Sequence, residues 1–286
     1  MGYPSEQELA HIAELARRSR MSVIEMLAEA QSGHLAGSLG MADIFAALYG
    51  YALRHDPERP EWEQRDRLIL SNGHIAPIRY ATMAHVGYLP VEELMTLRAL
   101  GSRLQGHPER TRLFALETTS GPLGDGLPQA AGIALAARIK HALYQTYVVT
   151  SDGEHQCGIV WEAAMFAAKN KLGALTNIVA RNRIQIGGDT EEVMPLEPFA
   201  EKYDSFGWHV QEVDGHNISQ FLETLAVAHE HAEQPSVIIA HTVPSKGVLE
   251  IEGDYLWHGK APSKEQAGRW IGALNAHQSR SMYHEA

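Results

Sequence analysis

Residues 147–182 read YVVTSDGEHQCGIVWEAAMFAAKNKLGALTNIVARN, and this stretch decides the fold. It opens with an apolar run at residues 147–150 and closes with another at residues 177–180, with a helical pattern between them. Asp152 and Asn182 follow the two runs and stand 30 residues apart (182 − 152). That length is typical of a strand-helix-strand crossover, which joins two parallel strands of one sheet. We therefore expect Asp152 and Asn182 to lie at the same edge of a parallel sheet.

Both residues carry oxygen atoms that suit a hard cation. Ligands of open α/β sheets bind outside the carboxyl ends of the strands, so the pair predicts a cation site for a phosphorylated cofactor. The surrounding residues, Ser151-Asp152-Gly153-Glu154 and later 181–188, resemble the thiamine-diphosphate signature. In that signature an Asp, an Asn and a backbone carbonyl hold Mg²⁺ or Ca²⁺ against the diphosphate.

Helical and strand patterns alternate along the rest of the chain. Ser5 and Glu8 form a capping-box signature before the first helical pattern, and a second helix is expected after Asp43. Other strands are expected at residues 67–70, 208–213 and 236–240, and other helices near residues 76–86, 91–100, 127–143, 197–206 and 218–232. This alternation predicts an α/β fold, a doubly wound and mainly parallel sheet with helices on both faces. Residues 1–286 are expected to form one domain, with a short C-terminal extension after about residue 262.

The composition excludes several classes of protein. A net charge of −11 and the lack of clustered Lys and Arg argue against nucleic acid or an anionic membrane as a partner. The single cysteine, Cys157, cannot form an internal disulfide. The first residues do not read as a signal peptide, and no apolar stretch reaches the length of a membrane helix. The expected compartment is the cytoplasm.

Glycines mark two further candidate features. Residues 101–126 form a long polar segment, typical of a functional loop, that ends in Gly121-Pro122-Leu123-Gly124-Asp125-Gly126 before a helix. The start of a helix can receive an anion, although a plain turn explains the glycines about equally well. Four histidines also stand beside glycines in predicted loops, and together they indicate a site: His34, His74, His107 and His258.

These motifs together resemble the N-terminal, pyrophosphate-binding domain of the transketolase family. The resemblance runs from about residue 12 to residue 262 and follows the family's order: Ser32-Gly33-His34, Ser71-Asn72-Gly73-His74, Gly106-His107-Pro108-Glu109, residues 117–124, Asp152-Gly153, Trp161-Glu162, Asn182 with Ile184, and His258-Gly259. It implies the thiamine-diphosphate-binding fold.

The resemblance also implies roles for individual residues. Asp152, Asn182 and the Ile184 carbonyl would bind the metal. The residues expected to contact the cofactor are His74, Gly121, Pro122, Leu123 and Gly153, together with the two metal ligands. His34, His107 and His258, called here the three substrate histidines, would bind substrate hydroxyls and move protons. Glu162 and Cys157 would lie at a subunit interface.

In this family a second, pyrimidine-binding domain completes the active site, and the present chain lacks it. The resemblance therefore implies the first half of a split transketolase, paired with a separate C-terminal subunit, two of each chain forming a heterotetramer. The predicted reaction moves a two-carbon ketol unit from a ketose phosphate to an aldose acceptor. The alternatives are the alpha subunit of a thiamine-dependent 2-oxo-acid dehydrogenase and a non-catalytic assembly subunit. The sequence departs from the family pattern at Ser151, Ala180 and Cys157, and the second alternative is motivated by Cys157 and Ser151.

Overall fold

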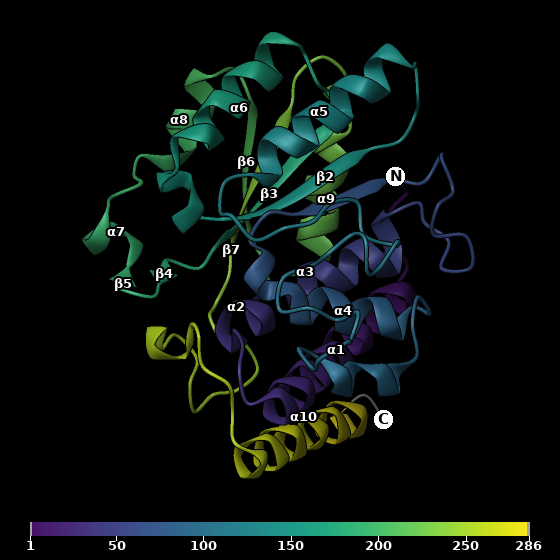
Figure 1. The fold of residues 1–286 in the computed structure, drawn as a ribbon, viewed down its shortest axis with the longest axis vertical. Helices are drawn as coiled ribbons and strands as arrows, with labels where there is room; N and C mark the ends of the chain where they lie inside the picture. Colours follow the sequence, from purple (N-terminus) through teal and green to yellow (C-terminus); the bar gives the residue numbers. More distant parts are fainter. Residues whose placement is uncertain (1, 285–286) are drawn as a thin grey trace.

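A five-stranded parallel sheet forms the centre of the computed structural model, which describes residues 2–284 and the side chains of residues 2–276 (Figure 1). Its strands in spatial order are β1 (Arg67–Leu70), β2 (Thr146–Ser151), β3 (Leu175–Arg181), β7 (Ser236–His241) and β6 (His209–Asp214). The central strands read as nearly continuous apolar runs because both faces of a covered parallel sheet are buried.

Helices cover both faces of this sheet. One face packs against α1 (Glu6–Ala30), α2 (Leu35–Gly40), α3 (Ala42–Ala47), α4 (Ala76–His85) and α9 (Ile218–Ala228), and the other against α5 (Gly126–Ile139), α6 (Gly158–Lys169) and α8 (Phe199–Ser205). Successive side chains of a strand point to opposite faces, so Tyr147 and Val149 enter one core while Val148 enters the other. The predicted doubly wound α/β fold is confirmed.

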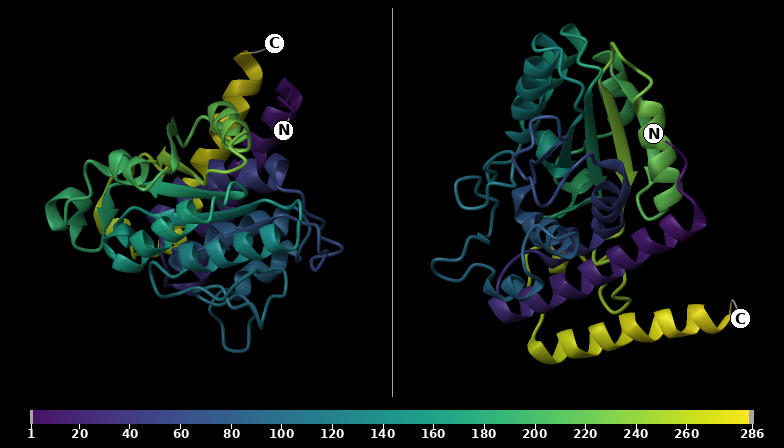
Figure 2. Two further views of the ribbon diagram at one scale, coloured as in Figure 1. Left: turned by 90° about the horizontal axis from the view of Figure 1, so that it is seen from above. Right: turned by 90° about the vertical axis from the view of Figure 1, so that its right-hand side faces the viewer.

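The first and last helices of the chain lie side by side. The Ser5 hydroxyl accepts a hydrogen bond from the Glu8 amide at 3.3 Å, and the Glu8 carboxylate accepts one from the Ser5 amide at 2.7 Å, so the predicted capping box starts α1. The last helix, α10 (Lys264–His284), runs along α1 (Figure 2). Trp257 meets Trp270 of α10 edge to face, with ring centroids 5.3 Å apart. Among residues 2–284, no helix is both long and apolar enough to cross a membrane.

The local structure differs from the sequence predictions at three places. The helix expected at residues 91–100 is a short 3-10 helix, η3 (Val91–Thr96), because the chain leaves helical geometry at Leu97 and Arg98 then adopts a φ of 63°. The helix expected after Asp43 continues as a π-helix, η1 (Leu48–Ala52), and is preceded by the unexpected α2. Residues 184–193 form a small hairpin and a helical turn that the sequence did not indicate: β4 (Ile184–Gln185), β5 (Gly188–Asp189) and α7 (Thr190–Val193).

Candidate active site

A cavity of about 530 Å³ opens at the carboxyl ends of β1, β2 and β3. Ser151 pairs with Ala180 at the ends of β2 and β3, so Asp152 and Asn182 emerge side by side at the edge that the sequence predicted. The cavity volume is in the range of small-molecule sites. Of the predicted site residues, those that line the cavity are His34, His74, His107, Gly121, Leu123, Gly153, Cys157, Asn182, Ile184 and His258. Asp152 is fully buried behind this wall, and Pro122 is not part of it.

Three of the four glycine-flanked histidines form a tight cluster on one side of the cavity. The ring of His34 lies 4.9 Å from that of His74 and 5.6 Å from that of His258, centroid to centroid. The rings of His74 and His258 are 5.3 Å apart. A Cβ added at Gly259 would lie 3.6 Å from Nε2 of His34, an ordinary van der Waals contact, so this approach does not depend on glycine after His258. His107 reaches the cavity from the long segment between η3 and α5.

The environment keeps these histidines neutral. Burial, with weaker contributions from His258, His107 and Arg98, lowers the pKa of His34 to about 4. Burial also lowers the pKa of His107 and His258, and it lowers that of His74 well below the usual value. A neutral imidazole has one N–H donor and one nitrogen acceptor, so each ring can both give and take a proton at neutral pH.

Glu154 joins three segments beneath the cavity. Its carboxylate accepts hydrogen bonds from the Ser71 hydroxyl at 2.9 Å, the Gly124 amide at 3.0 Å and the Ser151 amide at 2.9 Å. The Ser71 oxygen in turn accepts a hydrogen bond from the Gly126 amide at 3.0 Å. Burial raises the pKa of Glu154 to about 7, against three hydrogen bonds that lower it. Glu154 was not predicted from the sequence, although its place two residues after the predicted metal ligand was a usable signal.

Two glycines of the loop that begins α5, Gly124 and Gly126, stand where a side chain would not fit. Gly124 has a φ of +90°, which favours glycine. A Cβ on Gly126 would lie 2.3 Å from Cβ of Ser71, so the start of α5 sits directly on the end of β1. Gly121 lies at the cavity wall with room beside it, since the nearest atom to an added Cβ is Cγ of His107 at 4.0 Å.

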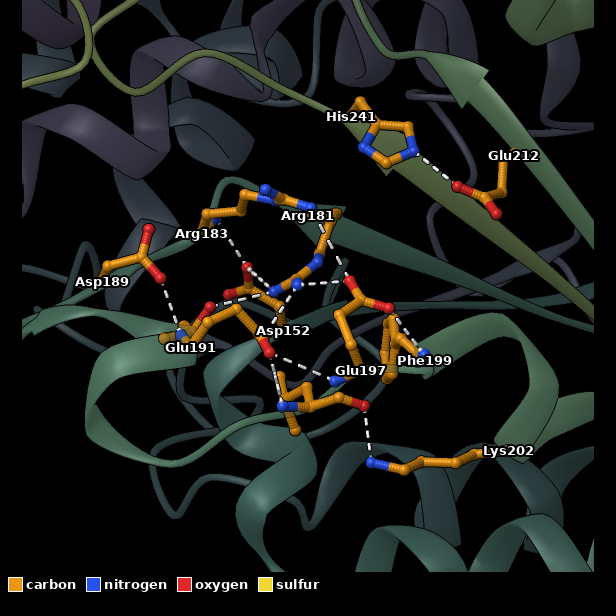
Figure 3. Close-up of polar contacts among 12 residues, drawn as sticks. Asp152, Arg181, Arg183, Asp189, Glu191, Glu197, Phe199, Lys202, Glu212 and His241 are labelled. Carbon is orange, nitrogen blue, oxygen red and sulfur yellow. Dashed lines mark hydrogen bonds and ion pairs between the residues drawn. The ribbon is translucent and has the colours of Figure 1, made fainter.

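The two predicted side-chain metal ligands already have protein partners. Asp152 accepts hydrogen bonds at Oδ1 from the Gly153 amide (2.7 Å) and at Oδ2 from the Arg183 amide (2.7 Å). Its Oδ2 also pairs with the Arg181 guanidinium at 3.1 Å (Figure 3). Burial outweighs these contacts and raises the pKa of Asp152. The amide oxygen of Asn182 accepts a hydrogen bond from the Ile184 amide at 3.0 Å.

The two predicted interface residues lie at the start of α6. Cys157 is half-buried and occupies the N-cap position of the helix, and Glu162 is exposed further along it. Burial, together with Glu154 and Asp125, raises the pKa of the Cys157 thiol. Three large apolar side chains on the same helix are exposed to at least 38%: Ile159, Met165 and Phe166.

The sequence of the chain that forms this cavity is similar to those of known proteins. Residues 12–271 match the family model described as transketolase, thiamine diphosphate binding domain. The chain belongs to the transketolase family. It is 39% identical over 263 residues to the 6-deoxy-6-sulfo-D-fructose transketolase subunit SqwG of Clostridium sp. (strain MSTE9), covering 91% of this chain and 94% of that protein. It is 37% identical over 251 residues to an apulose-4-phosphate transketolase subunit of Phocaeicola vulgatus, covering 88% of this chain and 89% of that protein.

A solved structure extends the likeness to a longer transketolase. The crystal structure of transketolase from Campylobacter jejuni superposes with a TM-score of 0.86 at 33% identity, over 94% of this chain but 43% of that one. The chain thus spans less than half of that enzyme and nearly all of the two subunit relatives. These matches confirm the predicted family and class: the chain is a thiamine-diphosphate-dependent transketolase subunit, and the enzyme is a transferase.

Proposed function

We propose that this chain is the pyrophosphate-binding subunit of a split transketolase that moves a two-carbon ketol unit from a ketose phosphate to an aldose acceptor. One observation carries the proposal. Neutral histidines, a glycine-rich loop and oxygen atoms of the kind that coordinate Mg²⁺ or Ca²⁺ lie together at one cavity at the sheet edge. The two subunit relatives are named for 6-deoxy-6-sulfo-D-fructose and apulose-4-phosphate, so sulfonated and phosphorylated sugars are both candidate donors.

The residues present fit a cation and a thiamine diphosphate. Carboxylate, amide and carbonyl oxygens are the ligands that Mg²⁺ and Ca²⁺ prefer, and Oδ1 of Asp152 has one protein donor, which leaves a lone pair. In addition, the side-chain oxygen of Asn72 and Nδ1 of His258 are buried at the cavity without a hydrogen-bond partner among the described residues. We propose that Asp152, Asn182 and the Ile184 carbonyl hold the cation. His74, Gly153 and residues 121–123 would hold the cofactor.

Thiamine diphosphate, when bound, supplies an electron sink for breaking the bond between C2 and C3 of the ketose. The three substrate histidines do the remaining work in this proposal. They orient the donor through its hydroxyl groups, and a neutral imidazole takes the proton from the C3 hydroxyl and returns it to the product. Burial of the cluster keeps these rings uncharged before substrate binds and so keeps an acceptor nitrogen available.

We propose that a separate C-terminal subunit supplies the pyrimidine-binding domain and that two of each chain form a heterotetramer. The word "subunit" in the names of both relatives supports a partner. Glu162, Cys157 and the exposed apolar side chains of α6 would lie at the interface. In this proposal residues 1–286 are one pyrophosphate-binding domain in a cytoplasmic enzyme.

The test is reconstitution. The full chain is purified alone and together with its pyrimidine-domain subunit, and each sample is supplied with Mg²⁺, thiamine diphosphate and a panel of phosphorylated and sulfonated ketoses. We expect ketol transfer from the mixture and none from the single chain. Activity in the single chain would refute the split enzyme. In the mixture, Asp152→Ala should abolish cofactor retention, while Glu230→Gln, at an exposed position outside the cavity, should leave it intact. Unchanged cofactor affinity in Asp152→Ala would refute the placement of the site.

A further inference from the structure

Arg181, the last residue of β3, is a buried cation at the back of the proposed metal site. Its guanidinium is 1% exposed and pairs with three carboxylates. Its guanidinium contacts Asp152 at 3.1 Å, Glu191 at 2.8 Å and Glu197 at 2.8 Å (Figure 3). Nη1 also donates a hydrogen bond to the Thr190 hydroxyl at 2.9 Å. These contacts connect the ends of β2 and β3 to residues 190–197. The ring of Phe199 lies 5.6 Å from the guanidinium carbon and closes the site from the side.

The charges of this group are unequal. One guanidinium faces three carboxylates, so with all four ionised the group carries a charge of −2 (+1 − 3). Nη1 contacts Asp152, whereas Nη2 is shared by Glu191 and Glu197. The two glutamates together outweigh the single charge of the arginine, so the group as a whole keeps negative charge next to the proposed cation site.

The same contacts fix the loop at residues 183–198. Glu191 accepts hydrogen bonds from the Leu196 and Glu197 amides, and Glu197 accepts one from the Phe199 amide at 2.8 Å. The Asp152 carboxylate reaches the other end of the loop through the Arg183 amide at 2.7 Å. Residues of this loop line the cavity: Ile184, Gln185, Ile186, Gly187 and Val193. Arg181 thus connects one proposed metal ligand to the loop that carries another.

We propose that Arg181 is a positioning residue for a divalent cation and its diphosphate: it holds the Asp152 carboxylate and the 183–198 loop in one fixed relation, with Glu191 and Glu197 as its counter-ions. This inference rests on the proposed cofactor site and adds the device that assembles it. Residues that contact a metal ligand and hold it in place typically contribute about 10–100-fold to metal affinity.

The experiment titrates thiamine diphosphate by calorimetry into the reconstituted complex of this chain with its pyrimidine-domain subunit, with and without Mg²⁺. We expect Arg181→Gln to weaken Mg²⁺-dependent cofactor affinity roughly 10–100-fold, and Arg181→Lys to restore part of the loss. Glu197→Gln, at a half-exposed position, should give a smaller loss in the same direction. Trypsin should also cleave faster after Arg183 in cofactor-free Arg181→Gln, because the loop loses its anchor.

The matched control is Arg20→Gln, which removes another buried arginine-carboxylate pair, with Asp43, away from the cavity. It should lower the melting temperature and leave cofactor affinity within about 3-fold of wild type. Wild-type or tighter cofactor affinity in Arg181→Gln would overturn the inference, and tighter binding would mean that the arginine competes with the cation. If Asp152→Ala loses affinity while Arg181→Gln does not, only this inference fails. If the wild type shows no Mg²⁺-dependent binding, the proposed cofactor site fails with it.

Discussion

Replacing Glu154 should destabilise the fold more than any change at an exposed carboxylate. In Glu154→Ala, three donors lose their acceptor: the buried Ser71 hydroxyl, the buried Gly124 amide and the partly buried Ser151 amide. Each unsatisfied donor costs about 1–3 kcal/mol. The hydroxyl can rotate away and water can enter the space, so we expect a total near the lower end, ~3–5 kcal/mol. That is a large part of a typical stability of about 5–15 kcal/mol.

Urea unfolding of the full chain measures this loss. Glu154→Gln keeps one oxygen for Ser71 and Gly124 but turns its NH₂ group toward the Ser151 amide, so it should lose about 1–3 kcal/mol. Glu162→Gln, exposed on α6, is the control and should stay within ~0.5 kcal/mol of wild type. If Glu154→Ala unfolds within about 1 kcal/mol of wild type, the value of one average hydrogen bond, then Glu154 does not hold the three segments together.

Three further outcomes are expected. Alanine at any of the three substrate histidines should lower the turnover of the reconstituted enzyme roughly 10²–10⁴-fold while calorimetry shows intact cofactor binding, and wild-type kinetics in all three would make them bystanders. Gly126→Ala should lower the free energy of unfolding by about 1–3 kcal/mol, because its Cβ would lie 2.3 Å from Cβ of Ser71. Gly132→Ala, which has open space on the same helix, should raise it by roughly 0.4–1 kcal/mol. Equal melting temperatures of the two variants would contradict the clash at Gly126. Because the pKa of the Cys157 thiol is raised, iodoacetamide should alkylate the isolated chain at about pH 8 more slowly than it alkylates glutathione. Mass spectrometry measures the rate, and faster modification of the chain would argue against a half-buried thiol.

The sheet and the location of the site were predictable because they depend on short-range patterns. A strand buried on both faces must be apolar, and a crossover of fixed length must return parallel, so residues 147–182 placed Asp152 and Asn182 correctly. The glycine-flanked histidines were also found, since glycine at a loop permits close approach. Their roles, by contrast, remain predictions.

The Arg181 group was not predictable from such patterns. Its glutamate partners stand 10 and 16 residues further along the chain, in the 183–198 loop. The strands of that loop are only two residues long, too short to show an alternation of apolar and polar residues in the sequence. Arg183 there has a φ of 60°, a conformation that its residue type does not announce. The helix expected at residues 91–100 was wrong for a related reason, because the chain leaves helical geometry at Leu97 and Arg98 then takes a left-handed conformation.

The contact between Trp257 and Trp270 gives the outermost helix a part in the geometry of the cavity. His258 is the next residue after Trp257, and burial of both indole rings leaves that loop little freedom to move apart from α10. The C-terminal helix thus helps to hold in position the wall of the cavity that carries His258.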